Sequence, residues 1–354
     1  MAMIYTFYSY KGGVGRSMAL ANVAECFYEK GLRVLIVDWD LEAPGLESFF
    51  YEPAGEGVTT DQSDEAAAVR SRLGLIDMLL SYKQMYRRLP LAALPAADSR
   101  AGKLSTDPVA RQTVNVDKVL DEHLPPLNDF VTPIHRDSSG RALWLLSAGW
   151  RQNRFSEYSR AVQSFNWDEF YGAFSGEAYF EWMRRQFNAL VDVVLIDSRT
   201  GVTEMGGVCA RQLADVVVSF CAPNFQNVDG VAKMVQSFRS SAVLAARKNR
   251  PIETLVIPTR IQNSELVLLG KFKELFHAQI ETDPQKGLFV RIGQIDHERF
   301  QVNDGLRFGV GVRLIGGAMV QCPRGCARDG QQDNQADHDR RRFLWGLLRH
   351  NALD

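Results

Sequence analysis

The chain has 354 residues, of which 45% are hydrophobic and 23% are charged, and its formal net charge at pH 7 is −1. This composition is typical of a globular protein with one large α/β domain or two smaller domains, and the near-neutral charge argues against a broad nucleic-acid-binding surface. We expect a cytoplasmic protein, because no run of about 18 apolar residues could span a membrane, no signal peptide precedes the first strand-like segment, and the five cysteines are isolated.

The first segments predict a strand, a glycine-rich turn, a helix and a second strand. Residues 3–8 are apolar and rich in β-forming side chains, and apolar residues recur with helical spacing from 17 to 30, before Gly31. Residues 33–38 (RVLIVD) are continuously apolar, as in a buried parallel strand. This order predicts an α/β fold with a doubly wound, mostly parallel sheet flanked by helices.

The rest of the chain divides into three parts. Residues 51–140 alternate polar stretches with short helix-like pieces, so we expect an inserted helical and loop segment at the edge of the sheet. Further strands are predicted at 142–149, 191–197, 214–222 and 253–259, and helices at 177–190 and 229–247. We expect one nucleotide-binding domain over 1–300 and a C-terminal tail over 301–354, first Gly-rich and then amphipathic.

The stretch YSYKGGVGRSMALAN at 8–22 has the features of a phosphate-binding loop. A loop that leaves a buried strand and opens a helix directs backbone N–H groups and the helix dipole at one point, which suits an anion. Its glycines permit positive φ angles and a close approach of the backbone to phosphate, and the Ser17 hydroxyl would face Mg²⁺. The residues predicted to hold the phosphates are Gly12, Gly13, Val14, Gly15, Arg16, Ser17 and Met18.

Carboxylates follow two of the predicted strands. Asp38 and Asp40 lie at the end of the second strand, and Asp197 ends the strand at 191–197. These positions belong to the sheet edge where open α/β folds bind ligands, and such carboxylates serve Mg²⁺ and orient an attacking water. Gly201 can lend an N–H near the γ-phosphate. The predicted Mg²⁺ ligands are Ser17, Asp38 and Asp197. For Asp38 or Asp40 alone, a helix-capping or turn role is a plausible alternative, but the pair at this position favours function.

On these motifs the chain resembles the deviant Walker A ATPases of the MinD/ParA group, in the SIMIBI class of P-loop NTPases. The loop motif K-G-G-x-G-[K/R]-[S/T] is specific, and the resemblance covers about 1–50, 142–230 and 253–263. It implies a Mg²⁺-dependent ATPase whose homodimer forms on ATP binding and holds ATP between its subunits. In such a dimer Lys11 would reach the partner's phosphates.

The resemblance also assigns roles to the carboxylates and to the late strands. Asp40 corresponds to the catalytic switch I aspartate, with Asp38 as its companion, and Asp197 to the Walker B aspartate. Adenine would lie near the segments that follow the late strands, which gives Pro223 and Arg260 as cofactor-binding residues. The predicted catalytic residues are Lys11, Asp40 and Arg16.

One residue of the loop departs from the family pattern, because Arg16 stands where the Walker lysine is expected. Arginine keeps the charge but is longer and planar, so the exchange is not conservative in a narrow loop. We therefore expect ATP binding with slow, dimer-dependent hydrolysis, in a nucleotide-driven switch that positions or regulates a protein partner or cargo. The alternative is a non-hydrolysing regulatory or scaffold protein. A tyrosine kinase with a related loop is disfavoured, because the last tyrosine is Tyr179.

Two segments near the C-terminus raise other hypotheses. The stretch RRRFLWGLLRH at 340–350 has a basic flank and an apolar helical face, which predicts either peripheral membrane contact or, as we favour, a helix docked on the protein's own surface. Cys322 and Cys326, with His338 nearby, suggest a metal site. Their spacing is one residue longer than that of the CPxC pair in related iron–sulfur scaffolds, so structural thiols are favoured.

Basic and aromatic residues give two more candidate surfaces. Nonspecific DNA binding through phosphate contacts is one interpretation of a basic cluster near the end of the predicted helix at 229–247, and a solvated helix end is the favoured one. The cluster comprises Arg239, Arg247, Lys248 and Arg250. The aromatic stretch at 165–183 is interpreted as a helical hairpin packed on the sheet, with a partner-binding surface as the alternative.

Overall fold

The structure is a computed structural model and describes residues 1–51, 65–89, 116–200, 208–238, 240–247, 249–260, 270–272, 274–275, 290–295 and 312–314. Its strands are β1 (Met3–Ser9), β2 (Val34–Asp38), β3 (Val131–Arg136), β4 (Ala142–Leu146), β5 (Val193–Asp197), β6 (Val216–Cys221), β7 (Glu253–Pro258), β8 (Val290–Ile295) and β9 (Val312–Leu314). Its α-helices are α1 (Arg16–Glu29), α2 (Glu65–Arg70), α3 (Leu75–Arg88), α4 (Val116–His123), α5 (Phe155–Gln163), α6 (Trp167–Phe174), α7 (Gly176–Leu190), α9 (Phe225–Ser237) and α10 (Ser241–Ala246).

The described strands form one sheet in the order β3-β4-β2-β5-β1-β6-β7-β8-β9. The strands from β4 to β8 run parallel, while β3 and β9 pair antiparallel at the two edges. The chain passes from β1 over β5 to β2 and later returns to β6 on the other side of β1, so the strand order reverses at β1. The crevice at such a reversal is where open α/β sheets bind ligands. This arrangement confirms the predicted fold class.

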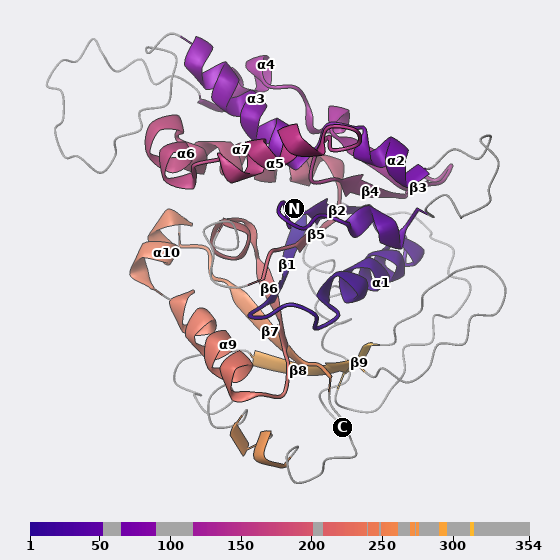
Figure 1. Cartoon of the computed structure of the whole chain (residues 1–354), viewed down its shortest axis with the longest axis vertical. Coiled ribbons are helices and arrows are strands. Elements are labelled where there is room, and N and C mark those ends of the chain that lie inside the picture. Colours follow the sequence, from indigo (N-terminus) through magenta and orange to yellow (C-terminus); the bar gives the residue numbers. More distant parts are fainter. Residues whose placement is uncertain are drawn as a thin grey trace, which may run out of the picture.

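The central strands are buried on both faces, which explains their unbroken apolar sequences. Every residue of β2 and of β5 is buried. The helix α1 packs on one face, in a core cluster with Tyr5 and Phe7 of β1. Side chains of α3, α4, α5, α6 and α7 pack on the opposite face with Ile4, and α9 packs on that same face with Tyr8. Figure 1 shows α1 on one side of the strands and the other large helices on the far side.

The segment predicted as an insertion contains regular elements at one edge of the molecule. Helices α2, α3 and α4 and the edge strand β3 all lie within it. The aromatic stretch at 165–183 forms α6 and the first half of α7, and its rings pack in the same core cluster as α3. This agrees with the hairpin interpretation. Strands β8 and β9 were not predicted, and β9 falls inside the segment expected to be a tail.

The prediction of one continuous helix at 229–247 is wrong, because the structure has two helices, α9 and α10, in this region. The helix α9 begins earlier, at Phe225, and ends at Ser237, whose hydroxyl donates to the Met234 carbonyl. The Ser240 side chain then accepts a hydrogen bond from the Val243 N–H and caps α10. Serines compete with the helical backbone for hydrogen bonds and favour helix ends, which explains the break. Within the described ranges, no helix combines the length and the apolar character that a membrane crossing requires.

Candidate functional site

The glycine-rich loop between β1 and α1 has the backbone shape of an anion cradle. Gly13 and Gly15 have φ angles of 73° and 80°, a region that side chains other than glycine rarely adopt. Gly15 is the N-cap of α1, and no side chain caps this helix. The N–H groups of the first turn and the positive end of the helix dipole are therefore available to a phosphate. In contrast, Gly12 has ordinary backbone angles, and a Cβ there would make only a normal contact with Thr200.

Arg16 does not point along the loop but lies between two of the predicted carboxylates. Its Nε donates to Asp197 Oδ1 at 2.6 Å, and its Nη2 lies 3.4 Å from Asp40 Oδ2. Its Nη1 donates to Ser9 Oγ at 3.4 Å, and only 7% of the arginine is exposed. One guanidinium thus joins the carboxyl ends of β1, β2 and β5. The structure therefore brings the predicted catalytic Asp40 and the predicted metal ligand Asp197 together through Arg16.

Asp38 has a different environment from the other two carboxylates. It is 1% exposed, and its Oδ2 accepts hydrogen bonds from the backbone N–H groups of Gly45 and Leu46 at 3.0 and 3.2 Å. It therefore holds the turn that leads into the short 3₁₀ helix Leu46–Phe49. Burial, with the Asp197 charge beside it, raises the pKa of Asp38 to about 7. Its role as a Mg²⁺ ligand stays a prediction, and its observed contacts are structural.

The other charges at this edge pair with one another. Burial raises the pKa of Asp40, and the Arg16 charge opposes that rise. Two residues after Asp197 and Asp40, respectively, Arg199 and Glu42 form an ion pair. This pair joins the loop after β5 to the loop after β2. Sequence reasoning missed this pair. The only available signal was the position of both residues immediately after the predicted carboxylates.

The remaining predicted site residues surround the loop at different depths. Ser17 and Met18 are half-buried in the first turn of α1, and Val14 is buried. Lys11 is exposed, and its ammonium contacts Gln226 at the start of α9. Arg260 follows β7 with a φ of 56°, and its guanidinium lies 3.5 Å from the place that a Cβ on Gly13 would occupy.

Pro223 is exposed between β6 and α9, at the same edge of the sheet. Gly201 lies outside the described residues, as do the cysteine pair at 322 and 326 with His338 and the basic, apolar segment at 340–350. Among the residues that are described, no group of three or more His, Cys, Asp or Glu side chains could hold a metal ion. A Mg²⁺ site built from one hydroxyl, one or two carboxylates and phosphate oxygens needs no such group.

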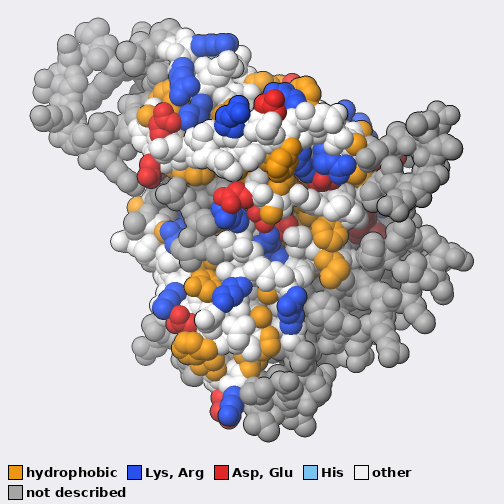
Figure 2. Space-filling model, in the orientation of Figure 1, with side chains coloured by type: hydrophobic (Ala, Val, Ile, Leu, Met, Phe, Trp, Pro, Cys, Tyr) orange, Lys and Arg blue, Asp and Glu red, His pale blue; other side chains and the backbone are white. Residues whose placement is uncertain are grey.

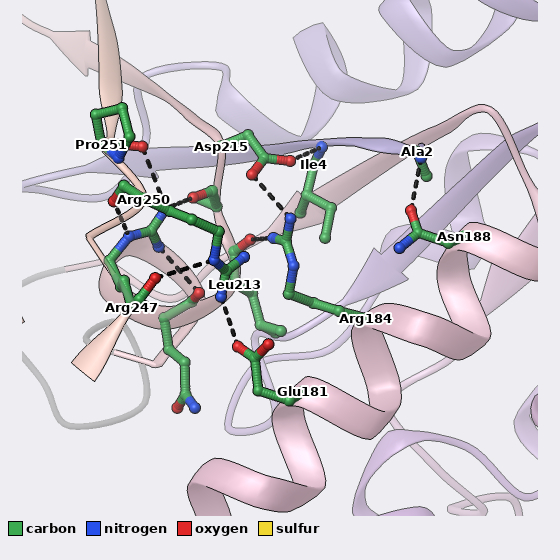
Figure 3. Close-up of polar contacts among 12 residues, drawn as sticks. Ala2, Ile4, Glu181, Arg184, Asn188, Leu213, Asp215, Arg247, Arg250 and Pro251 are labelled. Carbon is green, nitrogen blue, oxygen red and sulfur yellow. Dashed lines mark hydrogen bonds and ion pairs between the residues drawn. The ribbon is translucent and has the colours of Figure 1, made fainter. Parts of the chain in front are cut away.

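For Arg247 the structure contradicts both the DNA-binding interpretation and the favoured solvated helix end, while Arg250 is half-buried. Arg247 is fully buried and donates to backbone carbonyls, and Arg250 pairs with Glu181 on α7 at 2.5 Å (Figure 3). A guanidinium in the interior cannot contact phosphates on a nucleic acid. Sequence reasoning had no means to separate a buried cation from a solvated one, because Arg247 is buried against the backbone of residues 211–214, which are more than 30 positions away in the sequence. Arg239 and Lys248 lie outside the described residues.

A family comparison identifies the chain once this geometry is known. The model of the CobQ/CobB/MinD/ParA nucleotide-binding domain matches residues 5–275, which span the glycine loop and the strand ends that carry the three carboxylates. The chain belongs to this family. It is therefore a P-loop nucleotide-binding protein of the MinD/ParA type, as the sequence predicts. No curated protein sequence matches the chain.

Solved structures with a similar course of the chain are only distantly related. A plasmid partition protein from Borrelia burgdorferi is 16% identical, with 84% of this chain and 90% of that chain covered and a TM-score of 0.44. A ParA family ATPase from Chlorobium tepidum is 14% identical, with 84% and 86% covered and a TM-score of 0.46. The MinC:MinD cell division complex from Aquifex aeolicus gives 16% identity, 84% and 82% coverage and a TM-score of 0.39. The family assignment rests on the family model.

Proposed function

We propose that the protein is a Mg²⁺-dependent ATPase that works as a nucleotide-driven dimerisation switch and so positions or regulates a protein partner. The observation that carries this proposal is the cluster of Arg16, Asp40 and Asp197 beside an uncapped helix N-terminus. Loop and carboxylates meet at the sheet edge where nucleotides bind in this class of fold. A phosphate would accept hydrogen bonds from the backbone N–H groups in the first turn of α1.

The donor set at this edge fits Mg²⁺ and a triphosphate. Ser17 supplies a hydroxyl in the first turn of α1, and Asp197 supplies a carboxylate that a cation, Arg16, already holds at 2.6 Å. Bound Mg²⁺ would neutralise charge on the phosphate oxygens. In this proposal Arg16 turns from the carboxylates toward the phosphates when nucleotide enters, which leaves Asp40 to orient the attacking water. Pro223 and Arg260, at the ends of β6 and β7, would lie on the adenine side.

Exposed side chains at the same edge support association between two copies. Lys11 stands at the surface, as a residue acting on a partner's nucleotide must. Nearby elements expose large apolar side chains, with Phe225 at the start of α9 61% exposed and Phe155 at the start of α5 64% exposed. Aromatic side chains are enriched at association surfaces.

The experiment is the rate of ATP hydrolysis per subunit over a wide range of protein concentration. We expect the rate to rise with concentration in the wild type and to stay low and flat in Lys11→Ala, with nucleotide binding retained. Lys118→Ala is the matched control, because Lys118 is also an exposed lysine but lies on α4. A wild-type rate that does not depend on concentration and that Lys11→Ala leaves unchanged contradicts the proposal.

A second function is favoured by one observation. Arg16 occupies both carboxylates that would serve Mg²⁺ and water, and a non-hydrolysing regulatory or scaffold protein would keep that arrangement when nucleotide binds. ATP binding without measurable hydrolysis at any protein concentration would favour this alternative. Dimer formation measured with ATP and with ADP would then show whether the chain still acts as a switch.

A further inference from the structure

A buried ion pair lies beside residues 39–45, which we call the Asp40 loop. Arg151 Nη2 is 2.6 Å from Glu47 Oε1, and the two side chains are only 5% and 4% exposed. Glu47 belongs to the 3₁₀ helix that follows the Asp40 loop, and Arg151 follows β4, the neighbour of β2 in the sheet. The pair therefore joins the chain after β2 to the chain after β4, at the edge of the sheet where the nucleotide site lies.

Burial sets this pair apart from the charges at the surface. Figure 2 shows Lys and Arg side chains interspersed with Asp and Glu side chains over the face that it draws. Such exposed charges contribute little when they pair, because water competes for both partners. Glu47 and Arg151, in contrast, lose their hydration on folding, and their attraction in the interior offsets that loss only in a well-defined geometry. A buried pair of this kind is therefore suited to fix a position.

Arg151 is anchored by the inserted segment. Its backbone N–H donates to the carbonyl of Arg70, the last residue of α2, at 2.8 Å. The N–H of the preceding residue, Trp150, donates to Asp77 Oδ2 on α3 at 3.0 Å. Arg70 also places its Nη1 3.7 Å from Glu47 Oε1, so that a second guanidinium faces the same carboxylate. The arginine of the buried pair is therefore fixed by α2 and α3, and Glu47 is the partner that it holds.

Backbone contacts hold the rest of the Asp40 loop. The Asp38 carboxylate accepts hydrogen bonds from the N–H groups of Gly45 and Leu46 at 3.0 and 3.2 Å, so the two ends of the loop meet. The Tyr158 hydroxyl on α5 donates to the Leu41 carbonyl at 2.7 Å. The residue directly after these two N–H donors is the glutamate of the buried pair, so the pair secures the end of the loop.

The side chain of Asp40 depends on this frame. Its carboxylate lies 3.4 Å from Arg16 Nη2, which is a long contact for a charge-assisted hydrogen bond. In the proposed reaction Arg16 turns toward the phosphates, so the place of Asp40 then depends on the backbone of its loop. A displacement of about 1 Å can cost a reacting group about a hundredfold in rate.

We propose that Glu47 and Arg151 are positioning residues for the reaction: their buried pair fixes the Asp40 loop and so keeps the Asp40 carboxylate where it orients the attacking water. This role rests on the proposed function, because Asp40 acts in this way only in a protein that hydrolyses its nucleotide. Since α2 and α3 anchor Arg151, the inserted segment contributes to the nucleotide site through this pair.

The test compares Glu47→Met, Arg151→Met and the variant that carries both changes. Each single variant leaves a buried charge without its partner and should unfold at a lower urea concentration, whereas the double variant should recover most of that stability. Apolar contacts are not directional, so the Asp40 loop should stay loosely placed in the double variant. We expect its kcat to be about ten- to a hundredfold below that of the wild type, with a KM for ATP within about twofold.

The matched control replaces another buried pair, by Arg184→Met together with Asp215→Asn. Arg184 and Asp215 are 2.9 Å apart, and their side chains are 7% and 22% exposed, but they lie at the opposite, amino edge of the sheet. This change should shift the urea midpoint and leave kcat per folded protein as in the wild type. A kcat that follows the urea midpoint in all variants, or a wild-type kcat in the Glu47→Met, Arg151→Met double variant, would overturn the proposal.

Hydrogen exchange keeps the test separate from the proposed function, because it needs no nucleotide. We expect the N–H groups of Gly45 and Leu46 to exchange about tenfold faster in the double variant at positions 47 and 151 than in the wild type, and those of β5 to exchange as before. Faster exchange in a protein that does not hydrolyse ATP would support the hold of the pair on the loop and count against the proposed function alone. Unchanged exchange would overturn the proposal, whatever the rate of hydrolysis.

Discussion

Two buried arginines lie at opposite edges of the same sheet and differ in what they hold. At the carboxyl edge, Arg16 contacts the carboxylates of Asp40 and Asp197. At the amino edge, Arg247 contacts backbone oxygens, those of Arg211, Gln212, Ala214, Arg250 and Pro251 (Figure 3). A carboxylate can exchange its arginine for a metal ion or a water. The buried carbonyls around Arg247, in contrast, would lose its hydrogen bonds if the arginine moved. The first arginine is therefore suited to move and the second to stay.

Arg184, Asp215, Arg247 and Arg250, which we call the amino-edge cluster, anchor a short helix of this chain. Residues Val208–Leu213 form a short π-helix, which leaves carbonyls without the usual helical donors. Arg247 takes two of these carbonyls, and Arg184 of α7 takes that of Leu213 and pairs with Asp215 at 2.9 Å. Burial lowers the pKa of Arg247 to about 10, so it remains charged at neutral pH.

The largest effect should follow from breaking the amino-edge cluster. Arg247→Ala removes the donors to several buried carbonyls, and each buried acceptor left without a partner costs about 1–3 kcal/mol. We expect a loss of about 3–5 kcal/mol in the free energy of unfolding, measured by urea denaturation. Arg247→Lys keeps the charge with fewer donors and should lose less. A loss below about 1 kcal/mol for Arg247→Ala would show that this cluster does not stabilise the fold.

A smaller effect is expected at Asp38, the last residue of β2. Its pKa is raised from 3.8 to about 7, so the folded state holds a proton that the unfolded state releases between these values. Stability should therefore fall as the pH rises from 4 to 7, by about 2 kcal/mol between pH 5 and 7 from this residue. Asp38→Asn, which can still accept from Gly45 and Leu46, should flatten that dependence in urea unfolding. An unchanged slope would contradict the raised pKa.

The burial of Asp40 and Asp77 raises their pKa values as well, and both contribute a fall of the same sign. The comparison between the wild type and Asp38→Asn at each pH isolates the part that belongs to Asp38. Asp77→Asn should remove only the part of the fall that belongs to Asp77, which likewise accepts from two backbone N–H groups but lies on α3, away from Arg16.

The smallest effect concerns Arg16 itself. Arg16→Lys restores the residue expected in this loop, and a single ammonium cannot span both carboxylates as the guanidinium does. We expect ATP turnover to rise several-fold, equivalent to about 1 kcal/mol in the activation barrier, with little change in unfolding free energy. The same exchange at Arg247 should lower stability and leave turnover per folded protein unchanged. Equal turnover in wild type and Arg16→Lys would show that Arg16 does not limit the reaction.

The sequence by itself determined the local order of the nucleotide-binding half. A continuous apolar run predicts a strand buried on both faces, and glycines between such a strand and a helical pattern predict the loop, since these properties depend on neighbouring residues alone. The positions of Asp38, Asp40 and Asp197 at strand ends followed from the same runs. The family motif could therefore be recognised from the sequence alone.

Only the tertiary structure decided which partner each charged side chain takes. The sequence predicted a phosphate contact for Arg16 and a solvated position for Arg247, but the partners that they take come from the elements that meet around them: β2 and β5 around the first, α7 and the π-helix around the second. The ion pair of Lys83 and Glu169 likewise depends on the packing of α3 on α6, because the two residues are 86 positions apart. Burial shifts the pKa values of these groups and strengthens their interactions, and burial depends on the assembled layers rather than on any single segment.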